Sequence, residues 1–60
     1  MSDVDRLAKL RHDLANPLAA LLAETQLLLM EPGQVSAEVL TALKEIEGLA
    51  IRMRTLLREG

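Results

Sequence analysis

Apolar residues recur at intervals of three and four along the first half of the chain, a spacing that places side chains on one face of an α-helix. Ser2 precedes this series as a potential N-cap, and Asp3 and Asp5 would lie in the first turn, where carboxylates favour the positive end of the helix dipole. Asp5 is also spaced to pair with Lys9 one turn later. We therefore predict a helix over about residues 3–30. Its apolar face comprises Leu7, Leu10, Leu14, Leu18, Leu21, Thr25 and Leu28.

A second apolar series with the same spacing follows a break in the pattern. Glu31 precedes Pro32, and the residue before a proline is biased away from helical angles, while Pro32-Gly33 is itself a turn signal. Ser36 is a potential N-cap, with Glu38 in the first turn behind it. We predict a turn over about residues 31–35 and a helix over about 36–58. The second series consists of Val39, Leu43, Ile46, Ala50, Met53 and Leu57.

The connection is short, so the two predicted helices must run antiparallel. Both apolar faces are wider than the seam of a two-helix contact, because Leu22 and Leu29 extend the first and Leu40, Leu49 and Leu56 extend the second. Half of the 60 residues are apolar, yet a chain of this length buries little surface by itself. The predicted fold is all-α: one domain over residues 1–60, an antiparallel helical hairpin that dimerises into a four-helix bundle.

Composition and charge exclude several classes of function. The net charge of −2, with mixed signs, argues against nucleic acid as a partner. The acidic N-terminus has no apolar run behind it and is not a signal peptide, and no apolar run approaches the ~20 residues of a membrane span, so we expect no membrane insertion by this segment. There is no cysteine for a disulfide or a thiolate site, and the single histidine offers too few ligands for a metal.

The candidate chemistry lies in one stretch that begins at the only histidine, His12. At ~100° per residue, His12 lies about 160° from Leu14 and should face solvent. Asp13 can accept the proton of one ring nitrogen and leave the other nitrogen as a nucleophile. Neighbouring helical residues do not face each other, but Pro17 could distort the helix because its ring meets the carbonyl of Asp13. Asn16, one turn beyond His12, could hydrogen-bond a phosphoryl oxygen or a water.

The stretch His12-Asp13-Leu14-Ala15-Asn16-Pro17-Leu18 resembles the H-box of the sensor histidine kinases of two-component systems. Its pattern is a histidine, an acidic residue, leucine, any residue, threonine or asparagine, proline and leucine. The resemblance extends over the whole chain, since the family's dimerisation and histidine-phosphotransfer domain is a helical hairpin of about this length. Arg11 is a departure, because the family often has a small residue there.

The resemblance implies a role for each residue that matches the motif. His12 would be the phospho-accepting nucleophile, and Asp13 the acid or base that activates it. Asn16 would position water when the phosphorylated receiver partner is dephosphorylated, and Pro17 would be the bend that frees the helix around the histidine.

The resemblance also implies partners and a location. The chain would form a homodimer in the cytoplasm, receive the phosphoryl group of ATP through the family's ATP-binding domain, and pass it to an aspartate of a response-regulator receiver domain. Sixty residues cannot hold that ATP-binding domain, so we expect no cofactor in this chain. It would be part of a histidine protein kinase, either a piece of a larger kinase or a stand-alone phosphotransfer module.

A row of small residues continues below His12 along the same helical face, and the outward face of the second helix also includes a glycine. If Pro32-Gly33 is the turn, Gly48 lies level with Leu18 and Ile51 with Ala15. We hypothesise that a receiver helix docks here; the alternative is an ordinary alanine-rich surface. The predicted docking residues are Ala19, Ala23, Lys44, Gly48 and Ile51.

Two other functions remain open at this stage. One is a purely structural homodimerisation hairpin without phosphotransfer, for which replacing His12 would have only a small surface effect. The other is a small helical regulator that binds nucleic acid, which the acidic balance disfavours.

Overall fold

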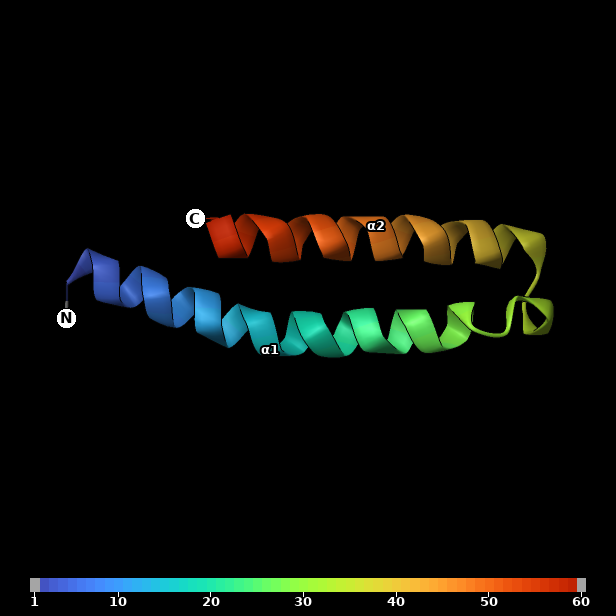
Figure 1. Cartoon of the computed structure of the whole chain (residues 1–60), viewed down its shortest axis with the longest axis horizontal. Coiled ribbons are helices and arrows are strands. Elements are labelled where there is room, and N and C mark those ends of the chain that lie inside the picture. The colour runs from blue at the N-terminus through green and yellow to red at the C-terminus, as the bar shows by residue number, and fades with distance from the viewer. Residues whose placement is uncertain (1, 60) are drawn as a thin grey trace.

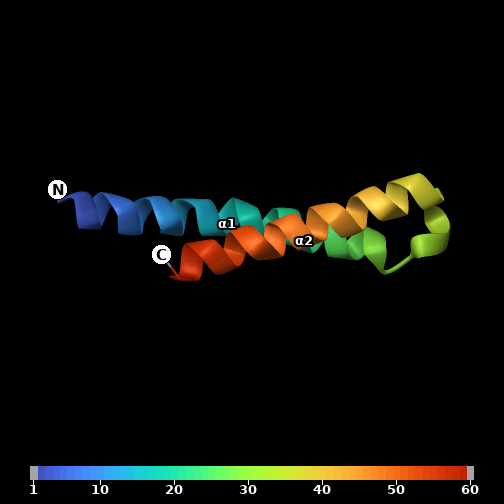
Figure 2. The same cartoon turned by 90° about the horizontal axis from the view of Figure 1, so that it is seen from above.

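The computed structural model describes residues 2–59, which form two long helices and one short one. Helix α1 spans Asp3–Leu29, the 3-10 helix η1 spans Pro32–Gln34, and α2 spans Ala37–Glu59; there is no strand among the described residues. The long helices lie side by side and antiparallel in a rod about 49 Å long (Figure 1). Seen from above, α2 crosses α1 obliquely (Figure 2). The predicted all-α hairpin is confirmed, and each helix ends within one residue of its expected position.

Local signals in the sequence account for where the helices begin and end. The Ser2 hydroxyl accepts a hydrogen bond from the backbone N–H of Asp5 at 3.1 Å, and the Ser36 hydroxyl accepts one from that of Val39 at 3.2 Å. Each bond satisfies a donor that the first turn leaves without a helical partner. Glu31, with φ −128° and ψ 69°, has left the helical region as its position before proline predicts.

The expected pairing of Asp5 with Lys9 is wrong. The Lys9 Nζ instead lies 3.2 Å from the Asp13 Oδ2, and in the turn before it Arg6 pairs with Asp3 at 2.9 Å. Lys9 has a carboxylate one turn away on either side, and spacing alone does not decide between them. The pair that forms places the ammonium group on the same carboxylate that lies 3.8 Å from the His12 ring.

The core of the hairpin is a narrow strip of side chains between the two helices. Ala50 is only 2% exposed, and the Thr25 hydroxyl is buried but donates a hydrogen bond to the Leu21 carbonyl at 2.8 Å. The bond satisfies the buried hydroxyl within its own helix, so the core tolerates this polar side chain. The buried residues are Leu18, Leu22 and Thr25 in α1 and Leu43 and Ala50 in α2, with Leu57 packed against them.

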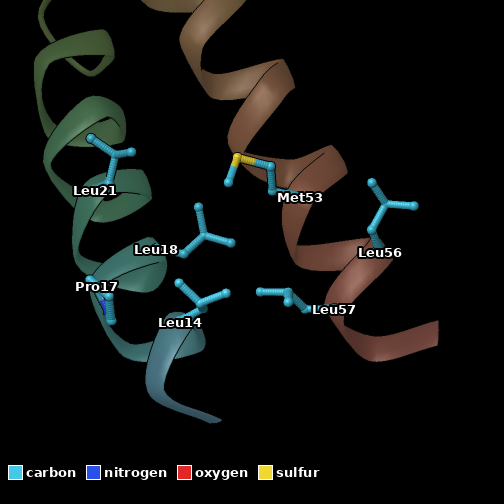
Figure 3. A pocket seen from close by; sticks show the side chains of 7 residues that line it. All are labelled: Leu14, Pro17, Leu18, Leu21, Met53, Leu56 and Leu57. Carbon is cyan, nitrogen blue, oxygen red and sulfur yellow. The ribbon is translucent and has the colours of Figure 1, made fainter. Parts of the chain in front are cut away.

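Much of each predicted apolar face is left exposed by the single hairpin. Leu21, which belongs to the first periodic series, is 51% exposed, and Leu56, which widens the second apolar face, is 60% exposed. They border an apolar groove of about 400 Å³ between the helices. In this groove Leu14 and Leu18 point from α1 toward Met53 and Leu57 of α2 (Figure 3). A second copy of the chain would cover this face, as the four-helix bundle requires.

The predicted register of the two helices is wrong. The α2 residues that share grooves with Leu18 lie between Met53 and Arg58, about two helical turns beyond Gly48. Ala15 likewise shares a groove with Arg54 and Arg58 rather than with Ile51. At the loop end η1 carries the chain past the end of α1 before α2 begins, so α2 starts farther out (Figure 1). At the other end, α1 extends past α2.

Candidate functional site

His12 lies in the early part of α1, near the open end of the hairpin where both termini lie (Figure 1). Its side chain is 79% exposed, because position 12 falls on the side of α1 that faces away from the core strip. The preceding residue, Arg11, lies on the α1 face that points toward α2 and is half-buried. The imidazole is therefore presented to solvent by a helix that is anchored on its opposite face.

The Asp13 carboxylate lies between the imidazole and an ammonium group. Its Oδ1 is 3.8 Å from the His12 Nδ1, which is too long for a hydrogen bond, and its Oδ2 is 3.2 Å from the Lys9 Nζ. Contacts of this kind are often long in the absence of substrate and commonly tighten only when a substrate is bound. In this arrangement Nδ1 faces the carboxylate and Nε2 is the ring nitrogen available to an electrophile.

Pro17 lies inside α1 without ending it. Because proline has no N–H, the carbonyl of Asp13 loses the hydrogen bond that a regular helix would supply. The first part of α1 runs at an angle to the rest of the helix (Figure 1), as expected for a proline in a helix interior. The backbone is thus loosened in the turn that follows His12.

Replacing Pro17 with alanine should stabilise the hairpin. The substitution restores an N–H donor to the Asp13 carbonyl and removes a clash, so we expect the free energy of unfolding to rise by about 1–3 kcal/mol. Thermal unfolding followed by circular dichroism measures this change. Ala15→Gly, which weakens the same turn by about 1 kcal/mol, is the control of opposite sign. A fall in stability for Pro17→Ala would show that the bend is required by packing.

Asn16 borders a second groove, of about 330 Å³, on the other side of the strip formed by Leu18 and Leu57. Ala15 and Ala19 also line it from α1. From α2 come Arg54 and Arg58, which lie near its C-terminal end, where cations favour the negative end of the helix dipole. The predicted register places other residues of α2 at the level of Asn16, so the sequence pattern does not bring these arginines near it. Only a correct register would have shown that they line the same groove as Asn16.

The predicted docking residues are only partly brought together. Ala19 lines the second groove, whereas Ala23, Lys44, Gly48 and Ile51 are exposed outside it. A side chain built at Gly48 would meet no atom within 4 Å, so nothing within this chain requires a glycine there. The hollow part of this surface therefore lies closer to His12 than predicted.

The part of the chain that the structure describes contains no helix that combines the length and the apolar content needed to cross a membrane.

Comparison with known proteins assigns the family. The sequence matches the His Kinase A (phospho-acceptor) domain over residues 4–59. No curated protein and no solved structure gives a significant match. The matched segment runs from the first turn of α1 to the last residue of α2 and includes His12 and its neighbours. The resemblance seen in the short motif is thus confirmed across the hairpin, and the chain belongs to the phospho-acceptor and dimerisation domains of two-component histidine kinases.

Proposed function

We propose that the chain accepts a phosphoryl group on His12 from ATP held by a separate catalytic domain, and passes it to an aspartate of a receiver domain. The observation that carries this proposal is an exposed imidazole whose Nδ1 faces a carboxylate at 3.8 Å. The family membership supports the same assignment.

In the first transfer His12 takes the phosphoryl group from ATP. The Nε2 lone pair of His12 attacks the γ-phosphorus of ATP, and a nitrogen–phosphorus bond forms as the bond to the β-phosphate oxygen breaks and ADP leaves. The positive charge that develops on the ring is relieved when Nδ1 gives its proton to Asp13. Lys9 keeps one oxygen of that carboxylate in place 3.2 Å away.

The second transfer reverses this protonation. A carboxylate oxygen of the receiver's aspartate attacks the phosphorus, the nitrogen–phosphorus bond breaks, and its electron pair returns to Nε2 while Asp13 returns the proton to Nδ1. Asn16, one turn along the helix, supports the later hydrolysis of the receiver's aspartyl phosphate by hydrogen-bonding the attacking water. The acting unit is a cytoplasmic homodimer, for which the exposed apolar groove provides the interface.

A phosphoryl-transfer assay tests the proposal. The chain is mixed with radiolabelled ATP and the isolated ATP-binding domain of a histidine kinase, and a receiver domain is then added. We expect label on the chain that is stable in base and labile in acid, followed by its movement to the receiver. An unlabelled chain that is dimeric in solution, with a catalytic domain shown to phosphorylate other hairpins, would favour the purely structural homodimerisation hairpin.

If the receiver domain docks beside Ala19, a bulky side chain at that position should slow phosphoryl transfer to the receiver. Tryptophan at position 19 would fill part of the groove next to Asn16, so Ala19→Trp should slow transfer to the receiver about tenfold and leave phosphorylation of His12 unchanged. Ala20→Trp is the matched control, because Ala20 is exposed and lies outside the groove. Stopped transfer reactions separated by gel measure both rates. Equal transfer rates for the two variants would exclude docking at this face.

A further inference from the structure

The second groove is positively charged although the chain as a whole is negative. Its lining includes two arginines, Arg54 and Arg58, and no acidic residue, whereas the net charge of the chain is −2. Among residues 2–59, the ion pairs involve Arg6, Lys9 and His12, so neither groove arginine has a carboxylate within 4 Å. The groove therefore has charge that the hairpin itself does not neutralise.

Arg54 occupies a position where an apolar residue would suit the hairpin better. It is half-buried on the α2 face that packs against α1, in line with Ala50 and Leu57. Its Nε is enclosed and has no hydrogen-bond partner in the described part of the chain. An enclosed donor without a partner destabilises a fold, and a leucine there would continue the apolar strip.

Arg58 brings a second positive charge close to Arg54. It lies one turn after Arg54 on the same side of α2, and like charges at this spacing repel each other. The enclosed Arg54 donor and the repulsion between the two arginines are unfavourable for an isolated hairpin, and an external anion seated in the groove would offset both. Since Asn16 lines the same groove, a ligand seated there would lie one turn from His12.

We propose that Arg54 and Arg58 are specificity-determining residues that select receiver domains whose docking helix carries carboxylates on the face it presents to this groove. This inference rests on the proposed function and adds a charge rule to it. The groove has an apolar floor of Leu18 and Leu57 with the alanines of α1 on one wall, which matches the apolar face of an amphipathic helix better than a bare phosphoryl group. The arginines then pair with acidic residues along that helix.

The test measures receiver binding and phosphoryl transfer separately. The variants are Arg54→Gln, Arg58→Gln and the double variant, and the probe is a receiver domain that binds the wild-type chain. Arg52→Gln is the matched control for each single variant, because Arg52 is exposed, lies outside both grooves, and its replacement likewise removes one positive charge. Because Arg54 is half-buried, circular dichroism must show that the Arg54→Gln chain remains folded. Arg58 is exposed, so Arg58→Gln should not disturb the fold and tests the inference independently.

We expect the double variant to weaken receiver binding at low ionic strength by at least about tenfold, with the Arg52 control unchanged. Added salt should weaken binding of the wild type and have less effect on the double variant. Phosphorylation of His12 by the ATP-binding domain should stay within about twofold of wild type.

Two results would overturn the inference. The first would be that the double variant binds the receiver as tightly as the Arg52→Gln control does. The other is a slower phosphorylation of His12 with receiver binding intact, which would assign the arginines to the ATP-binding domain. Because binding is measured on the unphosphorylated chain, a chain that binds the receiver through these arginines but never accepts phosphate would refute the proposed function and leave this inference standing.

Discussion

Replacing His12 with glutamine should abolish phosphoryl acceptance and leave the fold intact. Glutamine has a similar size and polarity but no ring nitrogen that can attack phosphorus, and the chain has no second histidine to take over. The side chain is 79% exposed and its nearest charged neighbour is Asp13 at 3.8 Å, so the stability should change by no more than about 0.5 kcal/mol. Incorporation of label from ATP and thermal unfolding measure the two quantities on the same sample.

The informative comparison is with Asp13→Asn. That variant keeps the nucleophile and removes the base, so it should accept phosphate slowly rather than not at all. Label on His12→Gln at the wild-type amount would mean that another residue is the acceptor. Loss of helicity in that variant would mean that the imidazole has a structural role that its exposure does not reveal.

Replacing Leu21 with glutamate should separate the dimer. Leu21 is 51% exposed in the hairpin and lines the apolar groove of Figure 3, which a second copy covers in a four-helix bundle. Burial of one leucine side chain contributes about 1.5–3 kcal/mol, it occurs twice in a symmetric dimer, and a buried carboxylate adds a further penalty. We expect the dimer dissociation constant to rise by at least about a thousandfold, since each 1.4 kcal/mol is tenfold.

Analytical ultracentrifugation over a range of protein concentrations measures the change. Leu27→Glu is the matched control, because Leu27 is 60% exposed and lies outside both grooves. If Leu21→Glu remained as dimeric as Leu27→Glu, the interface would have to lie on another face. Since a small hairpin buries little surface by itself, the monomeric variant should also unfold at a lower temperature.

The features that depend on local sequence were predictable. Ser2 and Ser36 cap the helices by bonds that involve residues three positions away, and Pro32 ends α1 through the backbone of its own neighbour. The exposure of His12 follows from the rotation of about 100° per residue in an α-helix, which places position 12 away from the apolar face. In all of these cases the determining atoms lie within a few residues of each other, so no knowledge of the other helix is needed.

The features that depend on how the helices meet were not predictable. The register of α2 against α1 is determined by how far η1 carries the chain beyond α1, and the positions of the prolines and glycines do not specify that distance. As a result Gly48 was placed beside Leu18, where Arg54 and Leu57 lie. The pairing of Lys9 with Asp13 likewise depends on a choice between two equivalent spacings.

Because α1 extends past α2 at one end, the contacts between the helices should form in a definite order, and the two ends of the hairpin should differ in local stability. Contacts close to the connection join residues that are near in sequence, and they can form within microseconds, whereas Leu18 and Leu57 meet only after both helices have grown outward from the turn. The first turns of α1 extend past α2 and have no helix of their own chain beside them (Figure 2). These first turns, which lead into His12, are therefore the segment that closes last and opens first, where backbone amide protons exchange with solvent fastest.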